Sequence, residues 1–242
     1  IIYILQGKFA PEYEKIKLGI SNKLILKSLS KVSGIDMGII EKMWADVGDI
    51  GQLSYDIIKS KKQNNLFNDK LMTSELIEQL NKMSKLEGKG STEEKIKILI
   101  KLYSKSEANS VKYITRMCIQ DMRIGAGFGV IRDSISKSFN IEKKIIQSSY
   151  DIYPDIANIA YLIKKNGINF SKNIKMSPGK PIKVMLFQKA KDVESSFEKL
   201  GKELSAEYKY DGFRLQIHRN NDEIKLFTRN LEEVSKQFPD II

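Results

Sequence analysis

The feature that most limits the fold is the helical spacing of apolar residues over residues 1–170. Apolar stripes with a period near 3.6 recur between short polar turns, which is typical of amphipathic helices. Trp44, the only tryptophan, lies in one such stripe and is expected in the core. The expected helices run from Asn22 to Gly34, from Thr73, from Ser91 (with Glu94 as a capping box), from Ala108 to Gln120 and from Val130 to Phe139. Residues from Ile141 to Lys165 are also expected to be helical, with Pro154 near a helix start. A mainly α N-terminal domain is therefore predicted.

The pattern changes near residue 176, and we place a domain boundary there. Residues 168–182 hold two of the five prolines and several Ser, Asn and Lys residues, which is typical of a linker. A short strand at Val184, Leu186 and Phe187, a helix from Val193 to Lys202 and strands on either side of an Asn-Asn-Asp turn are then expected, with Asn230 and Glu233 as a helix N-cap box. The C-terminal part is therefore predicted to be the opening of an α+β domain.

Composition points to a polyanionic partner. The chain carries 41 Lys and Arg against 30 Asp and Glu, a net charge of +11, although a lysine-rich solvated surface has the same composition. The single cysteine, Cys118, excludes an internal disulfide and fits a reducing, cytoplasmic compartment. No apolar run approaches the ~20 residues that cross a bilayer, so no membrane association is expected.

Two segments of the helical region are candidate phosphate contacts. Lys61 and Lys62 lie in the basic polar stretch at 59–65, which begins with Lys59 and for which a solvated connector is the alternative. The stretch RIGAGFG at 123–129 lacks the spacing and the preceding strand of a dinucleotide fingerprint. We interpret it as a turn before a helix, where glycines and free backbone N–H groups admit a phosphate. A plain inter-helix turn is the alternative.

The stretch EYKYDGFR at 207–214 has the residues of a covalent phosphoryl-transfer site. We expect an extended strand, because Tyr and Phe favour strands. Period two then sets Lys209 between the carboxylates of Glu207 and Asp211 on one face. A neutral lysine amine can attack phosphorus, but the two carboxylates favour the ammonium form unless a cation such as Mg²⁺ or loss of solvent offsets them. Cross-strand ion pairs on a solvated face are the alternative.

The same stretch resembles the adenylylation motif of ATP-dependent DNA ligases. Thr228-Arg229-Asn230 resembles that family's second motif, with Thr in place of the usual Ser. Residues 178–186 resemble the segment leading into the catalytic domain, although Val184 replaces a usual proline and Phe187 a small residue. Residues 46–51 and 121–127 are similar to segments of the helical DNA-binding domain of replicative-type ligases. The resemblance covers nearly the whole chain and is closest to archaeal members.

The resemblance implies a division into a helical DNA-binding domain at 1–176, a linker at 177–182 and the start of an adenylylation (nucleotidyltransferase) domain at 183–242. It implies that the chain is an internal fragment, truncated at both ends, so that this chain neither seals nicks nor adenylylates itself. It implies ATP and Mg²⁺ as cofactors, nicked duplex DNA and a sliding clamp as partners, a monomeric enzyme, and action near the nucleoid in DNA replication, repair and recombination.

The resemblance also assigns roles to single residues. Lys209 would be the nucleophile, Glu207 would bind the adenine amino group, Arg214 and Arg229 would contact the nucleotide phosphates, and Asp211 would hold the local geometry. Arg123, Gly125 and Gly127 would lie against the minor groove of the nicked duplex. Lys183 is a weaker nucleotide- or DNA-site candidate. His218 is expected to be a plain surface residue with no part in the motif, because strand parity points it away or it lies too far along the chain.

Three other functions stay open. An RNA ligase or a capping guanylyltransferase shares the Lys-x-Asp-Gly nucleophile, although the long basic helical region ahead of the motif argues against both. A non-catalytic module that binds nicked duplex DNA would need only the helical region. A basic helical protein-interaction domain is supported only by charge and helix content.

Overall fold

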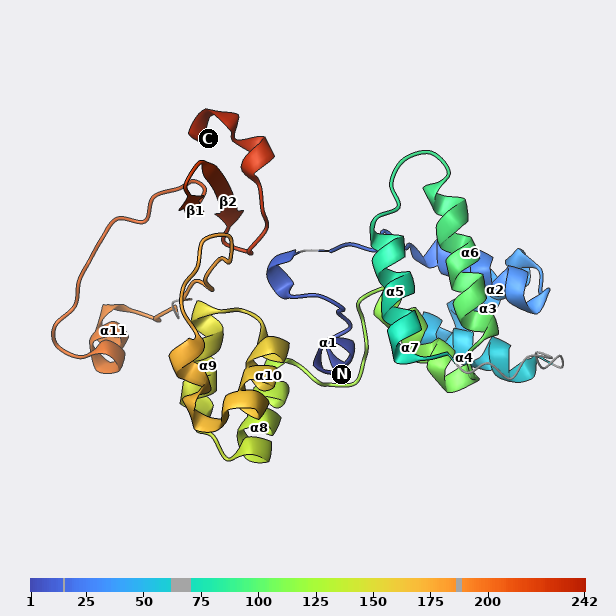
Figure 1. Ribbon diagram of the computed structural model, residues 1–242, viewed down its shortest axis with the longest axis horizontal. Coiled ribbons are helices and arrows are strands. Elements are labelled where there is room, and N and C mark those ends of the chain that lie inside the picture. Colours follow the sequence, from blue (N-terminus) through green and yellow to red (C-terminus); the bar gives the residue numbers. More distant parts are fainter. Residues whose placement is uncertain (15, 62–70, 186–188) are drawn as a thin grey trace. The chain divides into compact units, whose positions relative to one another are not determined.

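The computed structural model describes residues 1–14, 16–61, 71–185 and 189–242. Contacts between residues divide the chain into two compact units. The first unit comprises Ile1–Pro11 with Lys15–Ser138, and the second comprises Glu12–Glu14 with Phe139–Ile242. Figure 1 shows helices through the first unit and both helices and a small sheet in the second. The two units are described separately below.

The first unit is helical throughout its described elements. Its helices are α1 (Ile2–Leu5), α2 (Asn22–Ser33), α3 (Met37–Val47), α4 (Ile50–Ser60), α5 (Thr73–Ser84), α6 (Ser91–Ser104), α7 (Ala108–Cys118) and α8 (Phe128–Phe139), whose last residue passes the unit boundary. The mainly α prediction is confirmed, with most helix bounds within two residues of those expected.

The core of the first unit lies between α2, α4, α6 and α7, where α4 packs on α7 and α2 on α6. Fully buried Leu29, Leu53 and Leu99 belong to it, and Trp44 packs against its edge as predicted. One polar chain is buried there: the Tyr103 hydroxyl lies 2.8 Å from Thr115 Oγ1, which donates to Ser54 Oγ at 3.1 Å. These polar atoms satisfy one another, so their burial costs little.

Side-chain caps fix where three helices begin. Ser21 caps α2, Asp36 caps α3 and Asp49 caps α4. The expected capping box of Ser91 and Glu94 is wrong. The helix begins at Ser91 itself, whose hydroxyl donates to the Gly88 carbonyl at 2.8 Å, while the Glu94 carboxylate accepts from Lys97.

The second unit contains two packed α-helices, a third short helix and a β-hairpin. Its elements are η1 (Glu12–Glu14), α9 (Lys143–Ile152), α10 (Ile156–Asn166), η2 (Gly167–Asn173), α11 (Val193–Leu200), β1 (Leu215–Asn220), β2 (Glu223–Thr228), η3 (Ser235–Gln237) and η4 (Pro239–Ile241). The region expected to be helical from Ile141 to Lys165 contains two helices, α9 and α10, and the second begins just after Pro154 as predicted. Pro154 lacks an N–H, and Asp155 caps α10 by accepting from Asn158 N at 2.9 Å.

The two strands form an antiparallel hairpin whose register pairs Leu215 with Thr228 and Asn220 with Glu223. Asn221 at the turn has φ 53°, a conformation that Asn tolerates well. The predicted pair of strands around the Asn-Asn-Asp turn is thus confirmed. The helix from Val193 is also confirmed, with Asp192 as its cap.

Two predictions for the second unit are wrong, and a third lies mainly outside the described residues. Residues 206–214 do not form a strand, because an extended segment needs a neighbouring strand for its backbone groups and none of the described residues pairs with it. No strand forms at 183–185, and residues 186–188 lie outside the described part. Asn230 caps no helix, because Thr228 Oγ1 accepts from the N–H groups of Asn230 and Glu232 and closes a turn.

The predicted linker is hydrogen-bonded to side chains of strand β1. Gln216 on β1 accepts from Ile182 N at 3.0 Å and donates to Ile182 O at 2.7 Å, and His218 Nδ1 accepts from Gly179 N at 3.1 Å. Burial lowers the pKa of His218, which keeps the ring neutral and able to accept. The expectation that His218 is a plain surface residue is therefore wrong.

None of the helices in the described part of the chain combines the length and apolar character that crossing a bilayer requires.

Candidate nucleic-acid interface and nucleotide motif

The candidate interface of the first unit is built around Asp49, the residue that begins α4. Its Oδ1 accepts from Gly51 N at 2.8 Å and Gln52 N at 3.0 Å, so it caps the helix. Its Oδ2 accepts from Arg116 Nη2 at 2.6 Å and from Arg123 Nη1 at 3.2 Å. Burial pushes the pKa of Asp49 upward, but the hydrogen bond from Arg116, the backbone donor and the two positive charges outweigh burial and hold it below its usual value.

Arg116 lies almost fully buried beneath the same loop. Besides Asp49, its guanidinium donates to the Met122 carbonyl at 3.3 Å, while its Nε has no partner among the described residues. A methyl group built on Gly51 would lie 2.6 Å from Arg116 Cγ and 2.8 Å from Nε. Only glycine at position 51 therefore leaves room for this side chain.

The loop at 121–127 leaves α7 with an unusual backbone. Gln120, Arg123 and Gly125 have φ values of 58°, 51° and 67°, in the left-handed region that non-glycine residues seldom adopt. Arg123 Nε donates to Asp121 at 3.0 Å, and this bond, with the charges of Asp49 and Asp121, raises the pKa of the Arg123 guanidinium. The side chain of Arg123 is still half exposed.

The predicted glycines lie on the open side of this loop. Gly125 and Gly127 are exposed, and a Cβ added at either would meet no atom within 4 Å. The structure therefore brings Arg123, Gly125 and Gly127 together on one exposed loop beside the start of α4. It also joins the two segments, 46–51 and 121–127, that were singled out in the sequence.

The opposite end of α4 carries the basic residues of the other predicted contact. Lys61 follows α4, while Lys62 lies outside the described residues. Between the two ends, Lys59 and Lys112 have their ammonium groups 5.4 and 5.9 Å from the centroid of the Tyr55 ring. Eleven helical residues span about 16 Å, so basic groups follow the whole length of α4.

Lys59 begins the basic stretch predicted as a phosphate contact, whereas sequence reasoning missed Lys112. Lys59 lies four residues after Tyr55, which is the spacing that brings two side chains together on a helix. Lys112 comes from α7 and donates to Gln52 at 2.7 Å. Only the packing of α7 on α4 brings it to this face, and no local pattern indicates that.

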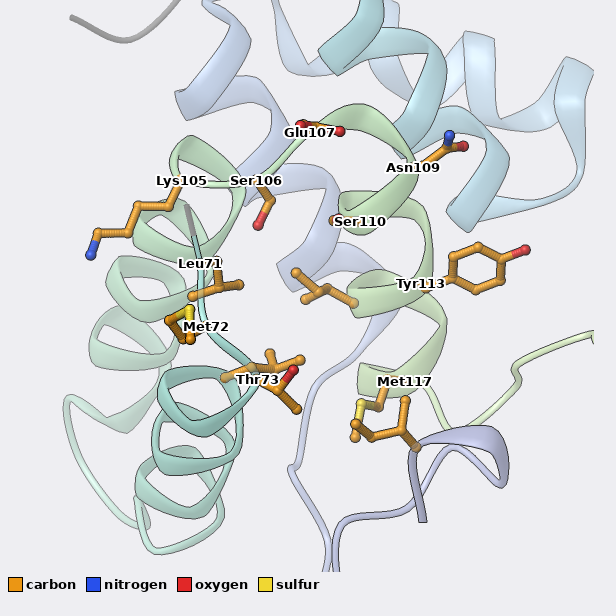
Figure 2. Close-up of a pocket in the computed structure, with 13 residues that line it drawn as sticks. Leu71, Met72, Thr73, Lys105, Ser106, Glu107, Asn109, Ser110, Tyr113 and Met117 are labelled. Atoms are coloured by element: carbon orange, nitrogen blue, oxygen red, sulfur yellow. The ribbon is translucent and has the colours of Figure 1, made fainter. Parts of the chain in front are cut away.

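A cavity of about 440 Å³ lies elsewhere in the first unit, among α1, α5 and α7. Figure 2 shows Leu71, Met72 and Thr73 on one side and Tyr113 and Met117 of α7 on the other. Ser106 also lines the cavity, and its hydroxyl oxygen is buried without a partner in the described part of the chain. No residue predicted from the sequence as a site residue lines this cavity.

In the second unit, Lys183 is held by a cluster of aromatic and acidic groups. Its N–H donates to the Asp151 carbonyl at 2.9 Å, and its ammonium group lies 4.9 Å from the Tyr150 ring centroid and 3.8 Å from Glu12. Tyr150 donates to Glu12 at 2.9 Å. Burial and the Glu12 carboxylate raise the pKa of Tyr150, so its hydroxyl stays protonated. These contacts dock the linker on α9.

The motif residues of 207–214 lie on an exposed segment. Glu207, Lys209 and Asp211 are exposed, and the neighbouring aromatic side chains are almost entirely so (Tyr208 88%, Tyr210 87%). The structure does not bring Lys209 into contact with the two carboxylates, because no strand forms to align them. This exposure leaves a large aromatic surface without a described partner.

The two predicted phosphate-binding arginines lie close together in the hairpin register. Arg214 precedes Leu215, Arg229 follows Thr228, and these two residues form the last pair of the hairpin. The hairpin therefore carries both guanidinium groups at its open end. Both arginines are exposed.

No group of three or more His, Cys, Asp or Glu side chains within the described ranges is arranged to hold a metal ion.

Comparison with known proteins decides the family. Residues 1–136 match the family model described as DNA ligase N terminus, and residues 184–242 match the ATP dependent DNA ligase domain. The chain belongs to the ATP-dependent DNA ligase family. The resemblance seen in the sequence is confirmed, and the second match covers the motif with Lys209.

The relatives of this DNA ligase family chain include several archaeal proteins named DNA ligase. Those of Methanobrevibacter smithii and Nanoarchaeum equitans are 34% and 33% identical over 239 and 241 residues, which is 99% and 100% of this chain. That of Sulfolobus acidocaldarius is 34% identical over 253 residues. The chain covers 43%, 42% and 42% of these relatives, so it spans about two fifths of their length.

Proposed function

We propose that the first unit binds nicked duplex DNA, and that the whole protein seals nicks with ATP through a lysine–AMP intermediate. The observation that carries DNA binding is the exposed Arg123–Gly127 loop, which lies beside the start of α4. Lys59 and Lys61 lie at the far end of this helix, and Lys112 of α7 contacts it at Gln52. Exposed glycines let a phosphate approach the backbone, and lysines contribute charge without sequence preference. Contacts of this kind suit an enzyme that must act at any sequence.

The proposed chemistry rests on family membership and on the match of residues 184–242 to the ATP-dependent domain. The Lys209 amine attacks the α-phosphorus of ATP, an N–P bond forms, and the bond to pyrophosphate breaks. The 5′-phosphate at a nick then takes the AMP from Lys209. Finally the 3′-hydroxyl attacks that phosphate, AMP leaves, and the strand is continuous. Splitting the reaction into such steps is the advantage of a covalent intermediate.

The other motif residues have proposed binding roles. Glu207 accepts from the adenine amino group, which favours ATP over GTP. Arg214 and Arg229, which flank the last pair of the hairpin, contact nucleotide phosphates, for which the guanidinium fork is suited. Asp211 holds the segment around the nucleophile.

Mg²⁺ is proposed as the second cofactor because phosphoryl transfer needs its charge neutralised. The described residues do not offer a suitable group of ligands, so we assign no residue of this chain to the ion and no step through it.

The setting of the reaction is also proposed. The division into a DNA-binding domain at 1–176, a linker at 177–182 and an adenylylation domain from 183 remains our prediction, as does a monomeric enzyme. A sliding clamp is the proposed further partner, and the cytoplasm near the nucleoid is the proposed location.

The decisive experiment for the chemistry uses the protein extended to the length of its relatives, with Lys209→Ala as control. Incubation with ATP and Mg²⁺ should add one AMP to the intact mass of the wild type and none to the variant. Addition of GMP from GTP would instead assign the protein to the capping class. The 242-residue chain alone should gain no AMP, and AMP on its Lys209 would contradict that expectation.

The decisive experiment for DNA binding uses the 242-residue chain and a fluorescent nicked duplex. Affinity should fall steeply with salt, because each released counterion contributes to the slope of log K against log salt concentration. Lys59→Gln with Lys112→Gln should lower that slope by roughly two. Binding that is indifferent to salt would refute the interface.

A further inference from the structure

We propose that Asp49 and Arg116 are positioning residues that hold the Arg123–Gly127 loop in its DNA-binding conformation. This inference rests on the proposed DNA binding by the first unit. It adds two residues that do not themselves reach the open side of the loop.

The contacts fasten the loop at successive positions. Asp121 N donates to the Arg116 carbonyl at 2.9 Å, and the Arg116 guanidinium donates to the Met122 carbonyl at 3.3 Å. Arg123 is then tied on two sides, to Asp121 at 3.0 Å and to Asp49 at 3.2 Å. Every residue from 121 to 123 thus makes a fixed contact, whereas Gly125 and Gly127 face open space.

The backbone needs this support. Gln120 and Arg123 are non-glycine residues with positive φ. Such a conformation costs energy of its own and persists only where surrounding contacts impose it. Arg116 and Asp49 supply those contacts from α7 and α4. They therefore fix the position of Gly125 and Gly127, which follow in the loop.

Charge gives a second argument. A carboxylate at a phosphate-binding surface repels the ligand, so Asp49 is out of place there unless it does something else. Its side chain is 16% exposed and that of Arg116 is 10% exposed. A pair so buried adds little stability over apolar side chains of the same size, whereas it does specify one arrangement of the groups around it. Helix capping accounts for Asp49 Oδ1, and positioning of Arg116 and Arg123 accounts for its Oδ2.

The test uses Asp49→Asn, with Asp36→Asn as its matched control. Asparagine caps helices as well as aspartate does, so both variants keep their helix start. Asp36 caps α3 through Gly38 N at 2.8 Å, and within the described ranges it has no arginine partner. Both variants remove one negative charge. Electrostatics alone therefore predicts equal or tighter DNA binding for both.

The positioning role predicts opposite signs for the two variants. Asp49→Asn should bind the nicked duplex about tenfold more weakly, the loss expected for one displaced charge-assisted contact. The magnitude of its slope of log K against log salt concentration should fall by about one, which corresponds to the loss of one phosphate contact. Asp36→Asn should bind as tightly as wild type. Amide NMR signals of Gly125 and Gly127 in the free protein should move in Asp49→Asn and stay in place in Asp36→Asn.

The remaining outcomes each decide the proposal. Equal or tighter binding by Asp49→Asn, with unmoved glycine amides, overturns it. If Asp49→Asn does not fold, Asp121→Asn takes its place. The Asp121 side chain is half exposed, and its ion pair is with Arg123, the same side chain that Asp49 holds. Weaker binding by that variant supports positioning and tighter binding overturns it. If wild type does not bind DNA, the proposed function fails, and the glycine amides alone decide whether the loop is positioned.

Discussion

Replacing Gly51 by alanine should destabilise the first unit, although Gly→Ala in a helix ordinarily stabilises. Gly51 is the second residue of α4, and an added Cβ would lie 2.6 Å from Cγ and 2.8 Å from Nε of Arg116. Arg116 is buried and holds Asp49 at 2.6 Å, so it has no free space into which to move. Overpacking of this kind costs about 1–3 kcal/mol, whereas the helix gains at most about 1 kcal/mol from alanine. The middle of the first range less the full helix gain leaves a net loss of about 1 kcal/mol.

The control is Gly129→Ala, which places alanine at the second residue of α8. An added Cβ there meets no atom within 4 Å, so only the helix gain remains. Urea unfolding followed by the fluorescence of Trp44, the only tryptophan, reports on the first unit. With a slope of about 1–3 kcal/mol per molar urea, the midpoint of Gly51→Ala should fall by roughly 0.3–1 M. A midpoint at or above that of wild type would refute the argument that Arg116 is closely packed.

Three further predictions follow from buried groups. The pKa of Asp49 is lower in the folded chain than in the unfolded chain, so its ion pairs stabilise the fold fully above about pH 4, the unfolded pKa, and this stabilisation is lost as pH falls through the folded pKa. The difference in unfolding free energy between wild type and Asp49→Asn, from urea unfolding at pH 5 down to pH 2, should therefore shrink. A constant difference would contradict this. Tyr103→Phe should cost about 1–2 kcal/mol in unfolding free energy, because the buried Thr115 hydroxyl loses a partner; a neutral change would show that the bond is not maintained. Burial raises the pKa of the Cys118 thiol to about 12, so iodoacetamide should label it only in urea, and rapid labelling of the native chain would be the contrary result.

Helical periodicity predicted the first unit well because its information is local. The apolar positions of each helix predict which face is buried, and an Asp or Ser residue before them predicts where the helix begins. The wrongly predicted capping box of Ser91 and Glu94 shows the limit of such local patterns. Ser91 has the right spacing to Glu94, but a hydroxyl that can bond to several nearby backbone groups bonded to the Gly88 carbonyl instead.

The candidate interface was predicted only in part. Arg123, Gly125 and Gly127 belong to a short glycine-rich pattern, which can be recognised from the sequence alone. Asp49 and Arg116 are 67 residues apart in the chain, and nothing local indicates that they meet. The same applies to Lys112, which reaches Tyr55 only because α7 packs on α4. Long-range packing is the part of a site that a single sequence does not show.

The strand expected at 206–214 failed for a related reason. Alternation shows which residues suit a strand, but a strand exists only when another pairs with it. Residues 215–228 satisfy this requirement within one hairpin, since each strand is the other's partner. The segment carrying Lys209 has no described partner, so its β-favouring residues stay exposed.

The short piece Glu12–Glu14 has a consequence for how the chain is divided in the laboratory. It belongs to the second unit, so the chain passes between units on either side of it and again at Ser138. A single protease cut near residue 138 would therefore leave Glu12–Glu14 on the fragment that carries the first unit. A clone beginning at Phe139 would lack the Glu12 carboxylate that Tyr150 and Lys183 contact. The second unit expressed alone from Phe139 thus lacks a segment that precedes most of the first unit in the sequence.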